Sequence, residues 1–265
     1  MLNPAMFYEV CQEVGRKQNL VIVDVGAGTG SLSREFLHGD VENDPALSRC
    51  ARQIQQARKN IVNIINIDNQ QHYIDEGQKI TDDERISFKL AEASKLPLDD
   101  GSADLVISRQ VLMHLSPEDL QKHFREIWRV LRAKCAYIFT VTNPGVEHLK
   151  YVLSQGGTLN SILEPRQAYQ YPHGAVRIPK HIKGNAAVIL QNMIGAKKSG
   201  TGTSHFLNQY FHVEVSYYEA ISRAHLIREK QDNLYSVVPG FEKTHARYYP
   251  PALPTSILFK VRKPI

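Results

Sequence analysis

The chain has 265 residues, of which 42% are hydrophobic and 22% are charged, a composition typical of folded globular proteins and not of disordered ones. Its three cysteines lie far apart without a C-x-x-C pair, which excludes a disulfide framework and a cysteine-rich zinc module. The net charge of +5 suits an anionic ligand or a nucleic-acid partner but requires neither. The sequence contains no apolar run of about 18 residues and no signal-peptide pattern, so we expect a cytoplasmic protein without a membrane span.

Strand and helix patterns alternate up to about residue 142, which predicts a parallel sheet covered by helices on both faces. Short apolar runs bounded by turn residues predict strands at 20–25, 61–67, 86–90, 103–107 and 136–141. Apolar residues at helical spacing and helix-capping residues predict helices at 31–37, 46–59, 71–78 and 117–131.

The character of the sequence changes after Pro144. Residues 145–205 are rich in Gly, His, Lys and Tyr with weak periodicity, so we interpret them as an insertion of short helices and loops. We expect residues 145–215, together with the extreme N-terminus, to cap the core. A helix at 214–223 and strands at 226–230 and 256–261 are expected to follow, with a long connection at 231–255. The sequence thus predicts one domain over residues 1–265, with its core at 18–143 and 216–265.

The most informative segment follows the first predicted strand, where residues 24–30 read DVGAGTG. Glycines here let the backbone turn tightly and approach a ligand closely, and the following helix offers free N–H groups to an anion. The spacing G-x-G-x-G differs from the G-x-G-x-x-G of dinucleotide-binding folds, which disfavours a nicotinamide oxidoreductase. Asp24 adds an acid that suits a ligand with an amino group, although a purely structural turn is the alternative interpretation.

The DVGAGTG pattern resembles the first motif of the class I (Rossmann-like) S-adenosyl-L-methionine-dependent methyltransferases. Residues 90–98, 99–108, 111–115 and 126–131 resemble later segments of this family, in the same order. The resemblance covers about residues 18–143, with a weaker similarity at 216–262. It implies an α/β fold, with a doubly wound, mostly parallel seven-stranded sheet and an antiparallel last strand. It also implies S-adenosyl-L-methionine as the cofactor and S-adenosyl-L-homocysteine as its product.

The resemblance further implies which residues hold the cofactor. The glycine-loop N–H groups suit the methionine carboxylate. Glu92 falls where the family places its adenine-side acid, and an exposed loop carboxylate is the alternative. Arg109 could pair with a carboxylate of the cofactor or substrate, and a surface arginine is the alternative. The residues expected to bind the cofactor are Asp24, Gly26, Ala27, Gly28, Gly30, Asp68, Asn69, Glu92, Ala93 and Arg109.

Two acids compete for the ribose hydroxyls, a role that nucleotide-binding folds give to a carboxylate at the end of the second strand. Glu42 follows Gly30 so closely that a helix and a strand hardly fit between them. Asp68 ends the strand predicted at 61–67. We therefore expect Asp68 to bind the ribose, which implies an additional helical segment at 39–60 and a departure from the compact layout of the family.

Methyl transfer from a sulfonium is an in-line displacement, for which the protein mainly has to align donor and acceptor. A base is needed only where the acceptor holds a proton of high pKa. His114 follows the fourth predicted strand, on the side where open α/β sheets bind ligands, so it is our candidate catalytic residue. A structural histidine is the alternative. We predict no metal site, because His123 and Glu126 have no further ligands at metal spacing.

We expect a methyltransferase for a small molecule, aromatic or carboxylate-bearing, since in this family an insertion after the fifth strand usually shapes a small-molecule pocket. The insertion is also basic, with Arg166 and Lys183 among its cations, which keeps an RNA or protein substrate open. The segment 39–60 and the turn at 132–135, which lacks the Pro-Gly-Gly common in the family, keep a third reading open: a module that binds the cofactor without transferring methyl.

Overall fold

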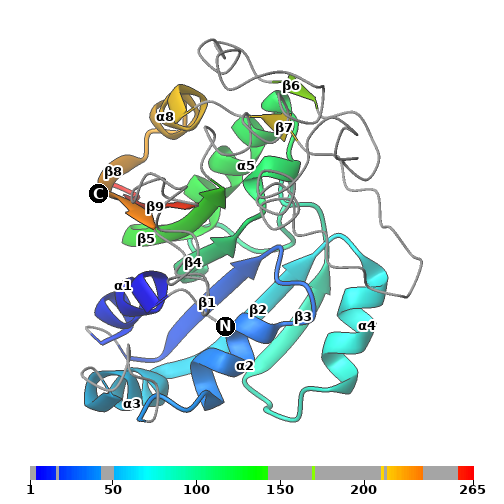
Figure 1. The fold of residues 1–265 in the computed structure, drawn as a ribbon, viewed down its shortest axis with the longest axis vertical. Coiled ribbons are helices and arrows are strands. Elements are labelled where there is room, and N and C mark those ends of the chain that lie inside the picture. The colour runs from blue at the N-terminus through cyan, green and yellow to red at the C-terminus, as the bar shows by residue number, and fades with distance from the viewer. Residues whose placement is uncertain are drawn as a thin grey trace, which may run out of the picture.

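A computed structural model of the chain describes residues 4–15, 18–42, 51–142, 169–170, 210–211, 214–234 and 256–265. Seven strands form one sheet in the order β3-β2-β1-β4-β5-β9-β8 (Figure 1). They are β1 (Leu20–Val25), β2 (Ile61–Asp68), β3 (Ile86–Leu90), β4 (Ala103–Arg109), β5 (Leu131–Thr142), β8 (Ile227–Leu234) and β9 (Ser256–Arg262). The first five pair in parallel, whereas β9 is antiparallel to both β5 and β8. This arrangement confirms the predicted doubly wound, mostly parallel seven-stranded sheet with an antiparallel last strand.

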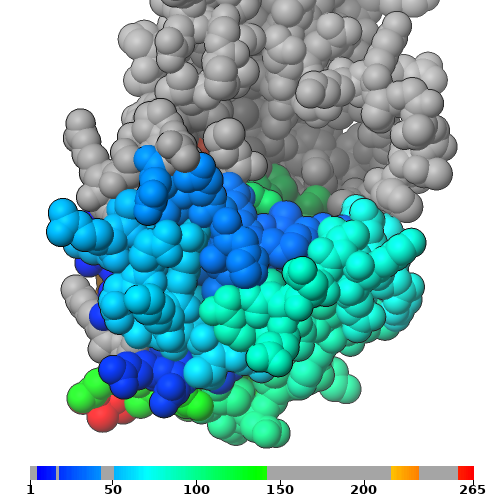
Figure 2. Space-filling model, turned by 90° about the horizontal axis from the view of Figure 1, so that it is seen from below, coloured from blue at the N-terminus to red at the C-terminus, as the bar shows by residue number. Residues whose placement is uncertain are grey.

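Helices cover both faces of the sheet, as Figure 1 shows. The helical segments are α1 (Pro4–Val14), α2 (Ser31–His38), α3 (Ala51–Lys59), α4 (Gln71–Lys79), the short 3₁₀ helix η2 (Leu112–His114), α5 (Pro117–Val130) and α8 (Glu214–Arg223). Apolar residues of α5 and α8 share one buried cluster with Val23 and Val106, while those of α1, α2 and α3 share the other with Ile22 and Leu105. In the view from below, the blue and cyan atoms of the N-terminal part of the chain form one continuous surface (Figure 2).

The junction between α5 and β5 differs from its prediction. The helix ends at Val130, and β5 begins at once, because Leu131 already pairs with Ala103 of β4. Lys134 adopts a left-handed φ of 63°, and its N–H donates to the carbonyl of Lys263 at 3.0 Å. The segment 132–135 is therefore an irregular stretch inside β5, and the expectation of a separate turn there was wrong.

The expected additional helix between β1 and β2 is partly described, as α3. Arg58 of α3 donates to the carbonyls of Phe36 and Gly39 at 2.7 and 2.6 Å, and so satisfies acceptors at the end of α2. The strand that follows α3 is β2, which lies beside β1. Asp68, and not Glu42, therefore ends the second strand of the sheet.

The predicted cap at 145–215 falls largely outside the described residues. Within it the structure describes β6 (Tyr169–Gln170) and β7 (Tyr210–Phe211), which pair in antiparallel fashion. Strand β8 continues to Leu234, four residues beyond its prediction, because its polar end still pairs with β9 at the edge of the sheet. The domain boundaries and the cap stay predictions. Among the described helices, none combines the length and apolarity needed to cross a membrane.

Candidate functional site

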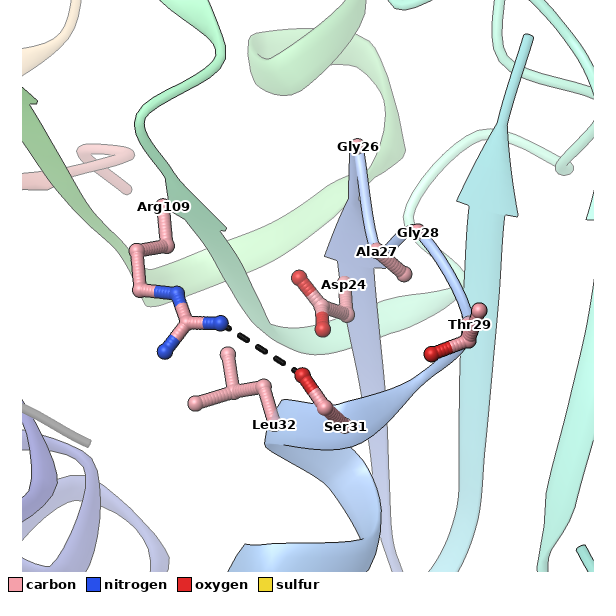
Figure 3. Close-up of a pocket in the computed structure, with 8 residues that line it drawn as sticks. All are labelled: Asp24, Gly26, Ala27, Gly28, Thr29, Ser31, Leu32 and Arg109. Atoms are coloured by element: carbon pink, nitrogen blue, oxygen red, sulfur yellow. Dashed lines mark hydrogen bonds between the residues drawn. The ribbon is translucent and has the colours of Figure 1, made fainter. Parts of the chain in front are cut away.

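The glycine loop lies at the carboxyl end of β1, between β2 and β4, where the strand order of the sheet reverses. Open α/β sheets bind their ligands at such a point. A cavity of about 180 Å³ opens here (Figure 3). Its lining residues are Asp24, Gly26, Ala27, Gly28, Thr29, Ser31, Leu32 and Arg109.

The backbone of the loop requires glycine at two places for different reasons. Gly26 has a φ of 71°, and a Cβ atom there would lie 2.2 Å from Cγ2 of Val111. Gly28 has a φ of 55°, but a Cβ atom there would meet nothing within 4 Å. Packing therefore constrains Gly26, whereas at Gly28 the left-handed backbone alone favours glycine.

The N–H groups of the loop are used within the protein. Those of Gly26 and Ala27 donate to the carbonyl of Ile67 at 2.7 and 3.0 Å, and that of Gly28 donates to Oδ2 of Asp68 at 2.8 Å. The N–H of Gly30 donates to the carbonyl of Ala27 at 3.0 Å. In this geometry these amides hold the shape of the pocket, and binding of a ligand carboxylate by the loop stays a prediction.

The first turn of α2 offers further backbone N–H groups to an anion. Gly30 occupies the N-cap position and has no side-chain oxygen, so no side chain caps the helix. The first amides of a helix have no carbonyl partner within it, and they carry the positive end of its dipole. Ser31 and Leu32 of this turn line the cavity. The sequence already predicted that the helix after the loop offers free N–H groups to an anion, although Ser31 and Leu32 were not among the predicted cofactor residues.

Asp24 is the buried acid of the site. It is 2% exposed, and its Oδ2 atom has no hydrogen-bond partner among the described residues. Burial raises the pKa of Asp24 to about 7; the guanidinium of Arg109 opposes this shift, and the charge of Asp68 adds to it. An unpaired carboxylate oxygen in such surroundings is costly, and an ammonium group of a ligand would supply the missing partner.

Arg109, at the end of β4, faces Asp24 across the cavity (Figure 3). Its Nη2 atom lies 3.4 Å from Oγ of Ser31, at the start of α2. The cavity therefore presents an acid on one side, with a cation and helix amides on the other. This arrangement suits a ligand with both an ammonium and a carboxylate group, such as the end of an amino acid.

A second group of predicted residues gathers beside the loop, at the ends of β2 and β3. Asp68 holds the N–H of Gly28 with one carboxylate oxygen and that of Gln70 with the other, at 2.8 and 3.0 Å. Nδ2 of Asn69 donates to Oε2 of Glu92 at 3.2 Å. The structure thus brings Asp68, Asn69 and Glu92 together. Ala93 follows Glu92 and packs partly against the core.

Glu42 and His114 lie outside this constellation. Glu42 is an exposed acid in the loop after α2, where its N–H donates to Asp40. His114 is half-buried on η2, beyond the end of β4, and does not line the cavity. Backbone atoms of η2 and β7 lie close together on this side of the sheet. Within the described part of the chain, no group of three or more His, Cys, Asp or Glu residues is placed to hold a metal ion.

Comparisons with known proteins agree with this fold. Residues 23–139 match a family model described as a methyltransferase domain. An S-adenosylmethionine-dependent methyltransferase from Mesorhizobium loti has 15% sequence identity and a TM-score of 0.56, over 96% of each chain. The geranyl diphosphate C-methyltransferase of Streptomyces coelicolor, solved with Mg²⁺, geranyl diphosphate and S-adenosyl-L-homocysteine, has 13% identity and a TM-score of 0.51, over 98% of this chain and 77% of that one.

The fold also occurs in a protein described by another activity. SpnF, a [4+2]-cyclase, has 16% identity and a TM-score of 0.52, over 99% of this chain and 82% of that one. No curated protein matches the chain significantly by sequence. At such low identities the solved structures show the common fold alone.

Proposed function

Since this chain belongs to the class I S-adenosylmethionine-dependent methyltransferases, whose cofactor is S-adenosyl-L-methionine, we propose that it transfers a methyl group to a small-molecule acceptor. The observation that carries the proposal is the cavity at the end of β1, with the unpartnered Oδ2 of Asp24 on one side and Arg109 on the other. These groups complement the ammonium and carboxylate of the methionine moiety.

Residues near the carboxyl ends of the strands would make the remaining contacts with the cofactor. The first amides of α2, together with Arg109, would hold the carboxylate, and Asp68 would accept hydrogen bonds from the ribose hydroxyls. Glu92, which accepts a hydrogen bond from Asn69, would accept another from the adenine amino group. When bound, the cofactor supplies a methyl group on a positively charged sulfur. The protein then has to align the acceptor and exclude water.

The acceptor would approach from the carboxyl edge of β4, where η2 carries His114. In this proposal His114 removes a proton from the acceptor or orients it, and the residues 145–215 shape the pocket. β7 belongs to that segment and lies beside η2, which supports this placement. O-, N- and C-methylation all fit this arrangement.

A second candidate is a protein that binds the cofactor and does not transfer its methyl group. The likeness to a [4+2]-cyclase shows that this fold is not tied to one reaction, so the fold by itself does not imply methyl transfer. An RNA or protein acceptor is a further alternative, supported by the basic residues of 145–215. Tight binding of RNA that weakens steeply with salt would favour it over a small molecule.

The first test is thermal unfolding with S-adenosylhomocysteine, S-adenosylmethionine, NADH and NADPH in parallel. We expect stabilisation by the first two alone, of about 2.7 kcal/mol at a hundredfold excess over the dissociation constant. Stabilisation by a nicotinamide nucleotide would contradict the proposal. Formation of S-adenosylhomocysteine with pooled small-molecule acceptors, lost in a His114→Ala variant that still binds cofactor, would then separate methyl transfer from binding alone.

A further inference from the structure

Side chains on one face of α5 form hydrogen bonds with the backbone of the loop that follows β3. His123, Glu126 and Arg129 are spaced by three residues, so their side chains share one side of the helix. Nδ1 of His123 lies 2.8 Å from the carbonyl oxygen of Ala93. Oε2 of Glu126 accepts a hydrogen bond from the N–H of Leu96 at 2.8 Å, and Nη2 of Arg129 donates to the carbonyl of Leu96 at 3.0 Å. All three side chains bind the backbone of the loop.

His123 differs from the other two because it is fully buried and belongs to a chain of hydrogen bonds. Its Nε2 atom lies 2.9 Å from the hydroxyl of Tyr137 on β5, which lies 2.7 Å from Oγ of Ser108 on β4. Burial lowers the pKa of His123 to about 4, while the bond to Ala93 and the charge of Glu126 oppose the shift, so the ring is neutral near pH 7.

The chemistry of the chain fixes the direction of each bond. The carbonyl of Ala93 can only accept, so Nδ1 of the neutral ring carries the proton and donates. Nε2 must then accept from the hydroxyl of Tyr137, whose oxygen accepts in turn from Ser108. The Ala93 carbonyl thus sets the tautomer in which Nδ1 of His123 carries the proton, and the Tyr137 hydroxyl supports this tautomer by donating to Nε2. The bonds connect that loop with Ser108, the neighbour of the pocket residue Arg109.

We propose that His123 is a positioning residue that fixes the Ala93 carbonyl and thereby sets the Glu92–Ala93 segment against the adenine ring of the cofactor. The proposal rests on the proposed function, which places adenine at this loop. Ala93 is held from the core side by His123, and Glu92 from the β2 side by Asn69. A shift of the Ala93 peptide would therefore turn Glu92 away from the adenine amino group while leaving the cavity at β1 intact.

The test compares S-adenosyl-L-homocysteine with S-inosyl-L-homocysteine, in which a carbonyl oxygen replaces the adenine amino group. Dissociation constants are measured by calorimetry on the full chain and its variants. In His123→Leu, which has no donor for Ala93, we expect binding of the adenine ligand to weaken about three- to tenfold, with the inosine ligand changed less than about twofold. His123→Asn places an amide N–H near the position of Nδ1 and should keep most of the preference for adenine.

Phe124→Leu is the matched control. Phe124 is equally buried on α5 and packs on the rings of His123, Tyr137 and Phe139, but it forms no hydrogen bond to the loop. The variant should therefore lower thermal stability without changing the adenine preference. If His123→Leu does not fold, Tyr137→Phe provides a second test. This variant removes the hydroxyl that donates to Nε2 of His123, and we expect it to weaken binding of the adenine ligand about two- to threefold.

The outcomes separate this proposal from the proposed function. Retention of the full adenine preference in His123→Leu, or its equal loss in Phe124→Leu, would overturn the positioning role while leaving the function intact. Failure of the unchanged chain to bind S-adenosylhomocysteine would overturn the function and the positioning role together.

Discussion

Asp24 illustrates at the scale of one residue how a binding site costs stability. Its carboxyl group is buried with one oxygen unpaired, and burial raises its pKa from 3.8 to about 7. Between these two values the folded state binds more protons than the unfolded state, so the free energy of unfolding falls as the pH rises. Above pH 7 the folded protein carries the whole cost of a buried charge, which the ammonium group of a ligand would offset.

We therefore expect Asp24→Asn to be more stable than the unchanged chain at pH 8, by on the order of 2 kcal/mol, because the amide carries no charge. The advantage should shrink as the pH falls toward 4. The same variant should bind S-adenosylhomocysteine about 10- to 100-fold more weakly, since a charge-assisted hydrogen bond is lost. Urea unfolding at several pH values and calorimetry measure the two effects; a variant with unchanged affinity would contradict the role of Asp24.

At the scale of elements, the end of β2 decides which acid can reach the ribose. Asp68 ends this strand beside the glycine loop, whereas Glu42 lies in the loop after α2. We expect Asp68→Ala to weaken binding of S-adenosylhomocysteine at least about tenfold, through loss of a charged acceptor and of its bond to Gly28. Glu42→Ala is the matched control and should change affinity less than about twofold. The opposite pattern would reverse the assignment.

Helix α1 is attached to the sheet by charges as well as by its apolar face. Glu13 is buried and accepts from Lys260 and Arg262 of β9, with N–O distances of 2.5 and 2.8 Å. Burial alone would raise the pKa of Glu13, but these two partners hold it below its usual value. The helix therefore depends on an acid that stays ionised inside the protein.

Lys260 also lies 3.5 Å from Glu9, and Arg262 also pairs with Glu229, so each cation keeps an acidic partner when Glu13 is replaced. We expect Glu13→Gln to lower the free energy of unfolding by about 2 kcal/mol, through loss of hydrogen bonds to a charged group. Glu118→Gln on α5 is the control, because Glu118 pairs with Lys122 at the surface and its loss should cost less than about 1 kcal/mol. Chemical denaturation measures the free energy of unfolding of both variants. Equal losses would show that the buried ion pairs of Glu13 stabilise the protein no more than the surface pair of Glu118.

At the scale of the whole molecule, two buried groups on opposite faces of the sheet oppose each other in their dependence on pH. Burial lowers the pKa of His123 from 6.5 to about 4, so over that range the unfolded state binds more protons and stability rises with pH. Glu126 and Tyr137 face its ring. Asp24, which faces Arg109 and Asp68, has the opposite slope over nearly the same range. Each slope is about 1.4 kcal/mol per pH unit, so the two nearly cancel.

Variants that lack one of the two groups should show the pH dependence of the free energy of unfolding that the other group causes. Between pH 4.5 and 6.5, Asp24→Asn should gain stability with rising pH, through His123. His123→Leu should lose stability over the same range, through Asp24. Free energies of unfolding from urea titrations at three pH values would show this, with Phe124→Leu as a control that keeps the flat profile. Equal slopes in the two variants would mean that other groups set the pH dependence.

The sequence by itself determined the order of the seven sheet strands and of α2, α3, α4, α5 and α8, and the place of the glycine loop, but it did not predict α1. Continuous apolar runs predict buried parallel strands such as 20–25 and 103–107, and the left-handed turns at Gly26 and Gly28 favour glycine. Both signals are local. The choice of Asp68 over Glu42 as the end of β2 followed from the same strand pattern. Boundaries failed where pairing overrides local preference, as at the start of β5 and along the polar end of β8.

The tertiary structure alone decided how the predicted residues act. The amides of Gly26, Ala27 and Gly28 are occupied because Ile67 and Asp68 of the neighbouring strand accept from them, so in our proposal the first turn of α2 holds the carboxylate. The unpaired oxygen of Asp24 and the burial of His123 depend equally on groups distant in the chain. Hydrogen-bond satisfaction and desolvation are properties of an assembled environment, so no local pattern of residues could have revealed them.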